Sequence, residues 1–478
     1  GAACIAARLG FVRLRNPAAC WRIMKALSLT TSFMPLPPLH RQFPRHFTWG
    51  VATSSFQIEG AAHADGKGES VWDRFCRQPG AIADGSNADL ACDHFHRLDE
   101  DLDLIASLGV NCYRFSIAWP RVQALGHGAF NPQGLDFYER LVDGLRQRGI
   151  DAWATLNHWD LPQGLQDRGG WNDRDTVHRF VDYARHVQAR LGDRLDGITT
   201  HNEPWVIATL GHEQGNFAPG IKSRKVAAQV SHHLLLSHGL AMQALRADGA
   251  RSKLGIVLNL ASTVPATAMP PDIEAADRAD ARSRRWYTEP LFKGHYPESV
   301  LAELGPDAPV VQPGDLAAIA QPMDYLGINY YTRSVVSASG EDWNAKGRDL
   351  PVTDMDWEIY PQGLTDLLVQ LQRDYPGLPP IYVTENGGAF KDSAVRDGRV
   401  QDDDRTAYLR SHIAALATAL QQGVPVAGYM VWSLMDNFEW ASGYLKRFGI
   451  VHVDYQTLQR TPKASAEWYR AFLRAWRG

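Results

Sequence analysis

The chain has 478 residues, which exceeds an average domain, although α/β barrels with insertions form single domains of more than about 400 residues. Its composition is that of a globular protein, with 45% hydrophobic and 21% charged residues and a formal net charge of -4. This charge balance argues against nucleic acid or an anionic membrane as a partner, and it favours a small neutral molecule.

Cysteine usage and hydropathy indicate a soluble protein of a reducing, cytoplasmic compartment. The cysteines form an odd set without CxxC spacing, which argues against a disulfide framework and a thiolate zinc site. They are Cys4, Cys20, Cys76, Cys92 and Cys112. No stretch reaches the ~18 consecutive apolar residues that a membrane span requires. The sequence leaves open whether the protein is a monomer or a homo-oligomer.

Residues 1–45 differ from the rest of the chain in charge, with seven Arg or Lys and no Asp or Glu. This bias resembles an organellar transit segment. The alternative is an upstream extension that precedes a true start at Met24 or Met34. In both cases we expect an N-terminal extension that packs poorly, followed by one folded domain over residues 46–478.

From Trp49 onward, short runs rich in β-branched and aromatic residues alternate with amphipathic segments. Eight runs predict β-strands, within residues 48–60, 111–119, 151–159, 196–204, 253–260, 323–332, 380–388 and 426–436. Apolar residues at spacings of three and four, with glycine at several ends, predict helices over residues 98–109, 134–149, 177–192, 406–423 and 465–478.

The alternation of strands and helices indicates parallel βαβ units, and eight such units close into a (β/α)8 barrel. A doubly wound open sheet is the alternative, but no GxGxxG follows the first strand. We therefore predict a single α/β domain, a (β/α)8 TIM barrel with extended βα loops.

Side chains that can bind a ligand gather at the C-terminal ends of seven of the eight predicted strands. They are Gln57, Arg114, His158, Asn202, Glu203, Asn329, Tyr331, Glu385, Asn386 and Trp432. The C-terminal ends of barrel strands meet at one face, where active sites of such barrels are built. The sequence therefore predicts one site at that face.

Two carboxylates stand out among these residues. Glu203 follows the fourth strand and Glu385 the seventh, so they face each other across the barrel mouth. Pro204 disfavours the α region for Glu203 and predicts an extended conformation there. Two carboxyl groups that flank a small molecule can hydrolyse a glycoside, one as the acid and the other as base or nucleophile. Either carboxylate alone is as consistent with a helix cap or an arginine partner.

Long stretches of the sequence resemble the signature blocks of glycoside hydrolase family 1, the β-glucosidase family. They are FTWGVATSSFQIEGA (47–61), YRFSIAWPR (113–121), THNEP (200–204), INYYT (328–332), DWEIYPQGL (356–364), VTENGG (383–388) and WSLMDNFEWASGYLKRFGIVHVD (432–454). These blocks occur in order from Phe47 to the C-terminus. The resemblance implies a barrel glycosidase that needs no cofactor and no metal.

The resemblance also implies a retaining double displacement, with Glu203 as general acid/base, Glu385 as nucleophile and carboxyl groups ~5 to 5.5 Å apart. Arg114 and Tyr331 correspond to the cation and hydroxyl that keep Glu385 charged, and Asn329 is a further supporting residue. Loss of that charge on glycosylation lowers the pKa of Glu203, which then acts as a base.

A set of sugar ligands and a set of leaving-group contacts follow from the same resemblance. The sugar ligands are Gln57, His158, Trp159, Asn202, Glu439 and Trp440, with Trp432 as the stacking platform. Asn202 is expected near the 2-hydroxyl of the sugar. The candidates for aglycone contacts are Trp205, Trp357, Phe448 and the loop at residues 212–220.

We therefore predict a retaining β-glucosidase that removes terminal non-reducing β-D-glucosyl residues from cellobiose and from aryl or alkyl β-glucosides, with a role in cellulose degradation. A β-galactosidase or β-fucosidase of the same family is the alternative, because Gln57 and Glu439 are expected near the hydroxyls that distinguish these sugars. A sugar-binding barrel without turnover is the alternative of a different class.

Several histidines need a separate interpretation. CDHFH (92–96) and the pair at 232–233 are predicted on helices without the spacing and third ligand of a zinc site, so we expect no metal there. His201 stands where the family usually has an aromatic or aliphatic residue, and strand alternation points it away from Glu203. A position close to Glu203 would instead depress the pKa of that acid.

Overall fold

The computed structural model describes residues 37–343 and 345–478. Contacts divide the chain into two units, Gly1–Gln42 and Phe43–Gly478. The described part of the first unit, residues 37–42, contains the 3-10 helix η1 (Leu39–Gln42). The expectation for residues 1–45 thus falls mostly outside the described residues.

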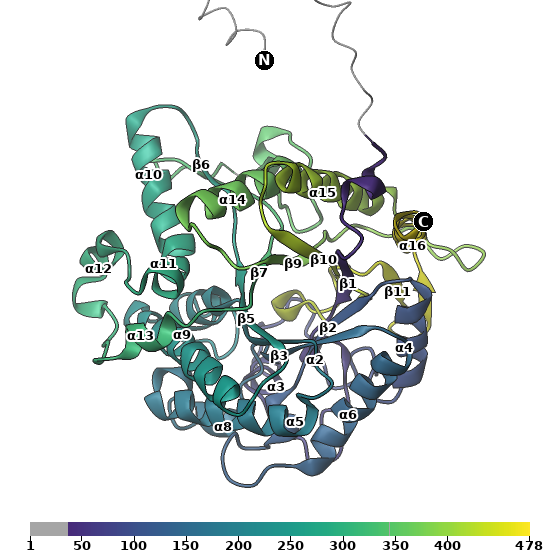
Figure 1. Cartoon of the computed structure of the whole chain (residues 1–478), viewed down its shortest axis with the longest axis horizontal. Coiled ribbons are helices and arrows are strands. Elements are labelled where there is room, and N and C mark those ends of the chain that lie inside the picture. Colours follow the sequence, from purple (N-terminus) through teal and green to yellow (C-terminus); the bar gives the residue numbers. More distant parts are fainter. Residues whose placement is uncertain (1–36, 344) are drawn as a thin grey trace, which may run out of the picture. The chain divides into compact units, whose positions relative to one another are not determined.

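Eight parallel strands of the described chain close into a barrel (Figure 1). They are β1 (Thr48–Ala52), β2 (Cys112–Ser116), β3 (Asp151–Asn157), β4 (Gly197–Asn202), β5 (Lys253–Asn259), β7 (Tyr325–Asn329), β9 (Ile381–Asn386) and β10 (Val426–Trp432). Strand β10 completes the ring by pairing with β1, with Trp49 opposite Tyr429. Each of the eight barrel strands lies within one of the predicted runs, which confirms the (β/α)8 barrel.

The larger helices cover the outside of the barrel (Figure 1). The α-helices are α2 (Ser55–Ile58), α3 (Val71–Cys76), α4 (Leu98–Ser107), α5 (Trp119–Val122), α6 (Pro132–Gln147), α7 (Gln163–Gln166), α8 (Arg174–Leu191), α9 (Arg224–Ala247), α10 (Pro270–Asp280), α11 (Trp286–Lys293), α12 (Glu298–Leu304), α13 (Asp315–Ile319), α14 (Pro361–Asp374), α15 (Asp403–Gln421) and α16 (Ala464–Arg477). Local signals fix their ends: the Asp173 side chain caps α8, and Gly192 follows its last residue. All five predicted helices are confirmed.

Further short elements lie in the loops between the barrel strands. The 3-10 helices are η2 (Gly170–Asn172), η5 (Gly305–Asp307), η6 (Ala345–Arg348) and η7 (Trp440–Ser442), and the π-helices are η3 (Val206–Glu213) and η4 (Ala281–Arg285). Strand β6 (Thr263–Pro265) pairs in parallel with β8 (Ser334–Val336), and β11 (Val451–Val453) pairs antiparallel with β12 (Arg460–Pro462). The βα loops thus have secondary structure of their own.

Large aromatic side chains fill the barrel interior. The indole of Trp153 lies 4.8 Å from the ring of Tyr325 and 4.6 Å from that of Tyr382, measured between centroids. The Tyr325 hydroxyl shares a hydrogen bond with Thr199 (2.5 Å), and Lys253 donates to the Tyr382 hydroxyl (3.2 Å). Because side chains fill the interior, the barrel has a solid core, and the strand ends are where a ligand can enter.

Several sequence expectations about single residues can be compared with the fold. Cys76, Cys92 and Cys112 are free thiols, and no described helix is long and apolar enough to cross a membrane.

The prediction of a helix at residues 92–96 is wrong: these residues form turns, because α4 begins only at Leu98. His94 there is buried and bonds Asp101 (2.8 Å).

The histidine pair at 232–233 does lie on a helix, α9, and both side chains are buried. His232 bonds Asp315 (3.0 Å) and the Tyr296 hydroxyl (2.9 Å), and His233 bonds the carbonyl of Trp171 (2.9 Å). Protein groups therefore satisfy these imidazoles.

Replacing Trp153 by alanine should lower the free energy of unfolding by ~3–5 kcal/mol, because it opens a cavity among the barrel aromatics. Denaturant titration followed by circular dichroism measures this loss. Leu445→Ala is the matched control, since that side chain is 58% exposed and its truncation should change stability by less than ~0.5 kcal/mol. Equal losses in the two variants would contradict the assigned core.

Candidate active site

The ends of the barrel strands bring the predicted polar side chains together. Asn202, Asn329 and Trp432 are the last residues of β4, β7 and β10, and His158 directly follows β3. Glu385 is the last but one residue of β9. Parallel strands in a closed ring place all these ends at one face, and hydrogen bonds connect several of them.

Glu385 is held at both oxygens of its carboxylate. Arg114 donates to Oε1 at 2.6 Å, and the Tyr331 hydroxyl donates to Oε2, also at 2.6 Å. Glu385 is 3% exposed and Arg114 is fully buried, so little water screens their ion pair. These two contacts fix both the plane and the charge of the Glu385 carboxylate.

Glu203 has one neutral partner and a special backbone. The Asn329 amide donates to its Oε1 at 2.5 Å, and the side chain is 5% exposed. The expectation of an extended backbone is wrong, because Glu203 has φ +50°, in the left-handed region. This conformation costs a non-glycine residue ~1–3 kcal/mol and occurs preferentially at functional sites.

The different surroundings of Glu203 and Glu385 shift the pKa values of their carboxyl groups differently. Burial, followed by the negative charge of Glu385, raises the pKa of Glu203 well above its usual value. Burial also raises the pKa of Glu385, but Arg114 and the Tyr331 hydroxyl oppose this rise. Of the two groups, Glu203 is therefore the one that keeps its proton.

The hydrogen bonds of Asn202 determine the tautomer of His158. Asn202 Oδ1 accepts from Arg114 (2.6 Å) and Asn329 (3.1 Å), so its amide nitrogen donates to His158 Nε2 (3.1 Å). Burial and the charge of Arg114 hold the pKa of His158 well below its usual range, so its ring is neutral. The remaining proton is on Nδ1, a buried donor without a partner among the described residues.

Glu439 also lacks a partner at one carboxyl oxygen. Its Oε2 is buried and unpaired within the described chain, and burial together with the charge of Glu385 raises the pKa of Glu439 to about 8. Gln57, by contrast, accepts from Ser54 (2.6 Å) and donates to Asn437 (3.0 Å) and to the Phe438 carbonyl (2.8 Å). Its amide thereby holds the loop that carries Glu439.

A cavity of about 430 Å³ opens above the two carboxylates. This volume is within the ~300–1,000 Å³ of typical ligand sites. The predicted site residues that line it are His158, Trp159, Glu203, Trp205, Asn329, Tyr331, Trp357, Glu385, Trp432, Glu439, Trp440 and Phe448. Arg114, Asn202 and Gln57 are fully buried and are not among its lining residues. Arg114 and Asn202 contact the lining groups from behind.

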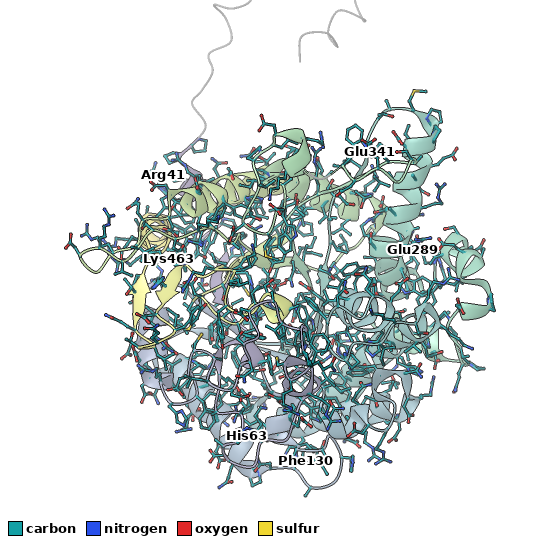
Figure 2. The ribbon with its side chains drawn as sticks, turned by 180° about the vertical axis from the view of Figure 1, so that it is seen from behind. Arg41, His63, Phe130, Glu289, Glu341 and Lys463 are labelled. Atoms are coloured by element: carbon teal, nitrogen blue, oxygen red, sulfur yellow. The ribbon has the colours of Figure 1, made fainter. Side chains whose placement is uncertain are left out.

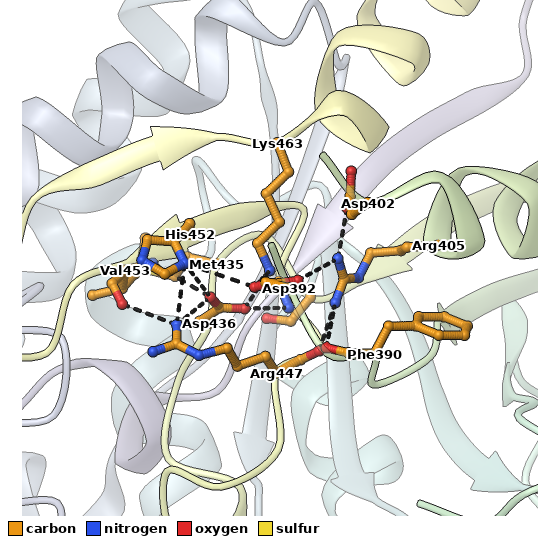
Figure 3. A network of polar contacts seen from close by, with 12 residues as sticks. Phe390, Asp392, Asp402, Arg405, Met435, Asp436, Arg447, His452, Val453 and Lys463 are labelled. Carbon is orange, nitrogen blue, oxygen red and sulfur yellow. Dashed lines mark hydrogen bonds and ion pairs between the residues drawn. The ribbon is translucent and has the colours of Figure 1, made fainter. Parts of the chain in front are cut away.

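A network of buried charges supports the loops that follow β9 and β10 (Figure 3). The ammonium of Lys463 lies 2.7 Å from Asp392 in the first loop and 2.8 Å from Asp436 in the second. Arg447 bonds Asp436 (2.6 Å), and Arg405 bonds Asp392 (3.0 Å). The network therefore fastens the loop that carries Glu439, Trp440 and Phe448 to the neighbouring loop and to the start of α16.

The same cluster contains a possible set of metal ligands. Asp392, Asp436 and His452 bring one ligand atom each within 4.8 Å of one another in the described chain. However, Lys463 bonds both carboxylates and Arg447 one of them, so protein cations already compensate their charge. The cluster is better described as an ion-pair network than as a cation site.

Comparison with known proteins agrees with this geometry. The model of glycosyl hydrolase family 1 matches residues 39–476, which is most of the chain. The chain belongs to glycosyl hydrolase family 1. It is thus a glycosidase of a family whose members retain the anomeric configuration.

Named relatives in the family are similar over nearly their whole length. Beta-glucosidase A of Acetivibrio thermocellus is 46% identical over 90% of this chain and 98% of its own. A bifunctional beta-D-glucosidase/beta-D-fucosidase of Bifidobacterium breve is 42% identical over 90% of this chain and 98% of its own. The virulence factor SghA of Agrobacterium tumefaciens, solved with its substrate analog salicin, is 45% identical with a TM-score of 0.88 over 91% of this chain and 97% of its own.

The sequence interpretation missed several residues of the cavity. Asn259 ends β5 and lines the cavity, so the rule that found the other strand ends could have found it too. The remaining missed residues lie in loops, in short helices and on the short strands β6 and β8, none of which the rule for barrel strand ends covers. They are Val206, Leu210, Leu260, Ala261, Thr263, Ser283, Thr332, Ser334 and Met355, whereas Phe217 belongs to the loop at 212–220 that the sequence interpretation included.

His201 points away from Glu203, as expected, but for a different reason. Regular alternation would place residues two apart on the same face, whereas β4 ends at Asn202 and Glu203 has a left-handed backbone. Its Nδ1 bonds Asn157 on β3 (3.0 Å), and its Nε2 bonds Ser237 on α9 (2.8 Å). The ring stacks on Phe180 with centroids 4.4 Å apart. Burial keeps the pKa of His201 well below its usual range. His201 is therefore a neutral packing residue of this family member.

Glu385→Gln should lower the pKa of Glu203, because it removes the negative charge that helps to raise that pKa. The pKa should still stay above the usual glutamate value, since burial remains. Titration by carbon-13 NMR with labelled glutamate measures the change. Glu439→Gln is the control and should shift the Glu203 pKa less, because Glu439 is the weakest of its raising influences. An unchanged pKa in Glu385→Gln would contradict the electrostatic coupling.

Proposed function

We propose that the chain is a retaining β-glucosidase that removes β-D-glucosyl residues from the non-reducing end of β-glucosides. The observation that carries this proposal is the unequal environment of two buried carboxyl groups. Glu385 is bonded by a cation and a hydroxyl, whereas Glu203 has only a neutral amide partner. One ionised and one protonated carboxyl group are what the first step of a double displacement requires.

In the first step, Glu203 donates its proton to the glycosidic oxygen while a carboxylate oxygen of Glu385 attacks the anomeric carbon. The bond to the leaving group breaks, the alcohol departs, and an ester joins the sugar to Glu385. In the second step, Glu203 takes a proton from water, which attacks the same carbon and releases Glu385. Two inversions give net retention.

The charge change during the reaction explains how Glu203 serves both steps. While Glu385 is ionised, its charge helps to keep Glu203 protonated. Formation of the ester removes that charge, so the pKa of Glu203 falls and its carboxylate can accept a proton from water. Arg114 and Tyr331 stay beside Glu385 throughout and stabilise it again as the departing carboxylate.

We assign the sugar to the part of the cavity that His158, Glu439, Trp432 and Trp440 line. The free Nδ1 donor of His158 and the free acceptor of Glu439 are complementary to sugar hydroxyls, each of which can accept and donate. Indole faces suit the C–H face of a pyranose ring. Asn202 is the proposed ligand of the 2-hydroxyl, although its side chain lies behind the cavity lining and bonds Arg114, Asn329 and His158.

We also propose roles for the remaining residues in binding the sugar and the aglycone. Trp159 and Gln57 complete the proposed sugar ligands, although the amide of Gln57 is engaged with the loop before Glu439. Trp205, Trp357 and Phe448 are the proposed aglycone contacts and line the same cavity. Cellobiose and aryl or alkyl β-glucosides are the proposed substrates. Cellulose degradation, a cytoplasmic location and the oligomeric state stay predictions.

Glu385→Gly should abolish turnover of a chromogenic aryl β-glucoside, because it removes the nucleophile. Azide should restore turnover and give a glycosyl azide of inverted configuration, detectable by NMR. Glu203→Ala should instead retain slow hydrolysis of aryl glucosides with good leaving groups, which need no acid. Full activity of Glu385→Gly would falsify the assignment, and a protein that binds but never turns over the substrate would favour the non-catalytic barrel.

A β-fucosidase or β-galactosidase activity is the second candidate, because the Bifidobacterium relative is named for both glucoside and fucoside hydrolysis. We expect kcat/KM for the aryl β-glucoside to exceed that for the β-fucoside and β-galactoside. Glu439→Gln should reduce the glucoside value at least ~10-fold, since an acceptor to the sugar hydroxyls is weakened. A higher kcat/KM for the fucoside or galactoside would reverse the ranking.

A further inference from the structure

Asp160 directly follows two proposed sugar ligands, His158 and Trp159, at the end of β3. Its side chain is 2% exposed and is not among the residues that line the active-site cavity. Trp159 has φ +79°, a left-handed conformation that a residue with a side chain keeps only where its surroundings hold it. The contacts of Asp160 therefore affect the position of both ligands.

Hydrogen bonds join Asp160 to the segments that follow the two preceding barrel strands. Its Oδ2 accepts from the Ser55 hydroxyl at 3.0 Å, and that hydroxyl accepts from the Ser116 hydroxyl at 2.9 Å. The backbone N–H of Ser55 also donates to the Ser116 oxygen, at 2.7 Å. Ser116 ends β2, whereas Ser55 begins α2, the helix after β1 that carries Gln57. Three side chains thus tie together the ends of three strands.

The other carboxyl oxygen of Asp160, Oδ1, is buried and has no partner within the described chain. Asp160 lines a cavity of only about 10 Å³, and Arg121 in the same lining has a buried, unpaired Nη1. The loop at residues 60–70, marked by His63 in Figure 2, forms one wall. Such a volume holds about one water molecule, so it cannot hydrate a carboxylate.

The charged groups around Asp160 are already paired with one another. The titratable groups that face it or its charged neighbours are Glu59, Lys67, Asp73, Arg121, Tyr138 and Tyr183. Lys67 lies 2.9 Å from Asp73, and Arg121 donates twice to Glu59, at 3.0 and 3.1 Å. The two phenols donate to Glu59 and to backbone carbonyls. Among the described residues, Asp160 therefore has no cation of its own.

A buried carboxyl group without a cation favours its neutral form. Burial, together with the negative charge of Glu59, raises the pKa of Asp160 to about 7, although the Ser55 hydrogen bond opposes this rise. Asp160 is consequently neutral in mildly acidic solution and ionises as the pH passes neutrality.

We propose that neutral Asp160 is a positioning residue that holds His158 and Trp159 in place for the sugar. The inference rests on the proposed function, in which these two residues bind the glucosyl unit. The neutral carboxyl group keeps the end of β3 bonded to Ser55. An ionised group has neither a cation nor room for hydration at this position, so ionisation displaces the segment. The affinity for the sugar therefore falls as the pH rises.

The test measures the competitive inhibition constant of glucose, a neutral ligand, against an aryl β-glucoside between pH 6 and pH 7.5. In the wild type this constant should rise about 3-fold, since about three quarters of Asp160 is ionised at the upper limit. The KM of the substrate should change in parallel. Asp160→Asn, which keeps an acceptor for Ser55 and cannot ionise, should retain the low-pH affinity over the whole range.

A second variant tests the link through Ser55. Because the Ser55 hydrogen bond lowers the pKa of Asp160, Ser55→Ala should move the loss of affinity to higher pH. A purely structural defect would weaken binding without moving that pH. Should Ser55→Ala fold poorly, Asp160→Asn still decides, because its amide has the size of the carboxyl group.

Two controls separate Asp160 from other titrating groups. Asp182→Asn changes an exposed carboxylate on α8 and should leave the inhibition constant at wild-type values throughout. Glu439, whose pKa is about 8, contributes equally in the wild type and in Asp160→Asn. The difference between these two proteins therefore reports Asp160 alone.

The outcomes distinguish the role of Asp160 from the proposed function. A wild-type protein that does not hydrolyse the aryl β-glucoside refutes the β-glucosidase assignment, on which that role rests. Normal hydrolysis with the same pH dependence of the inhibition constant in the wild type and in Asp160→Asn refutes the role of Asp160 alone. Equal weakening at every pH in Asp160→Asn also overturns it, since such a loss reports damaged packing.

Discussion

The site is organised around one buried positive charge. Arg114 has no exposed surface, and such a charge is stable only where anions and acceptors compensate it. Its guanidinium donates to Glu385 and to Asn202 in one fork, which ties β2 to β9 and β4. Asn202 in turn orients His158. The charge of the proposed nucleophile and the position of the proposed sugar ligands therefore depend on the same side chain.

Backbone strain accompanies this electrostatic arrangement. Glu203, Trp159 and Trp440 all have φ between +48° and +79°, a region that side-chain-bearing residues avoid. All three line the active-site cavity. Packing holds them there: the Trp159 indole, for example, donates to the Asn202 carbonyl (2.9 Å). The barrel supplies the rigidity that keeps such conformations populated.

The sequence was enough to predict the barrel and about half of the residues that line the cavity, for a physical reason. Strand and helix periodicities are local. In a closed parallel barrel, residues at the same end of different strands lie at the same face. This is why Asn202, Asn329 and Glu385 could be placed together without a structure. The same rule applied to the fifth strand would have found Asn259 as well.

The features that could not be predicted depend on contacts between distant parts of the chain. No local sequence pattern in residues 206–213 predicts the π-helix η3. The left-handed backbone of Glu203 contradicts the local preference set by Pro204, because tertiary contacts overrule it. The Gln57 amide bonds the loop at 437–438. Its partner Asn437 lies 380 positions later in the chain.

The ion pairs of Lys463 have a consequence for how the protein is made. Asp392 and Asp436 belong to loops beside the proposed catalytic carboxylates, and the lysine that balances both comes after them in the chain. Strand β10, which closes the ring against β1, is likewise a late element. A nascent chain that already carries Glu203 and Glu385 thus still lacks the groups that fasten their surroundings. The surroundings of the proposed catalytic pair can therefore be completed only after Lys463 has been synthesised.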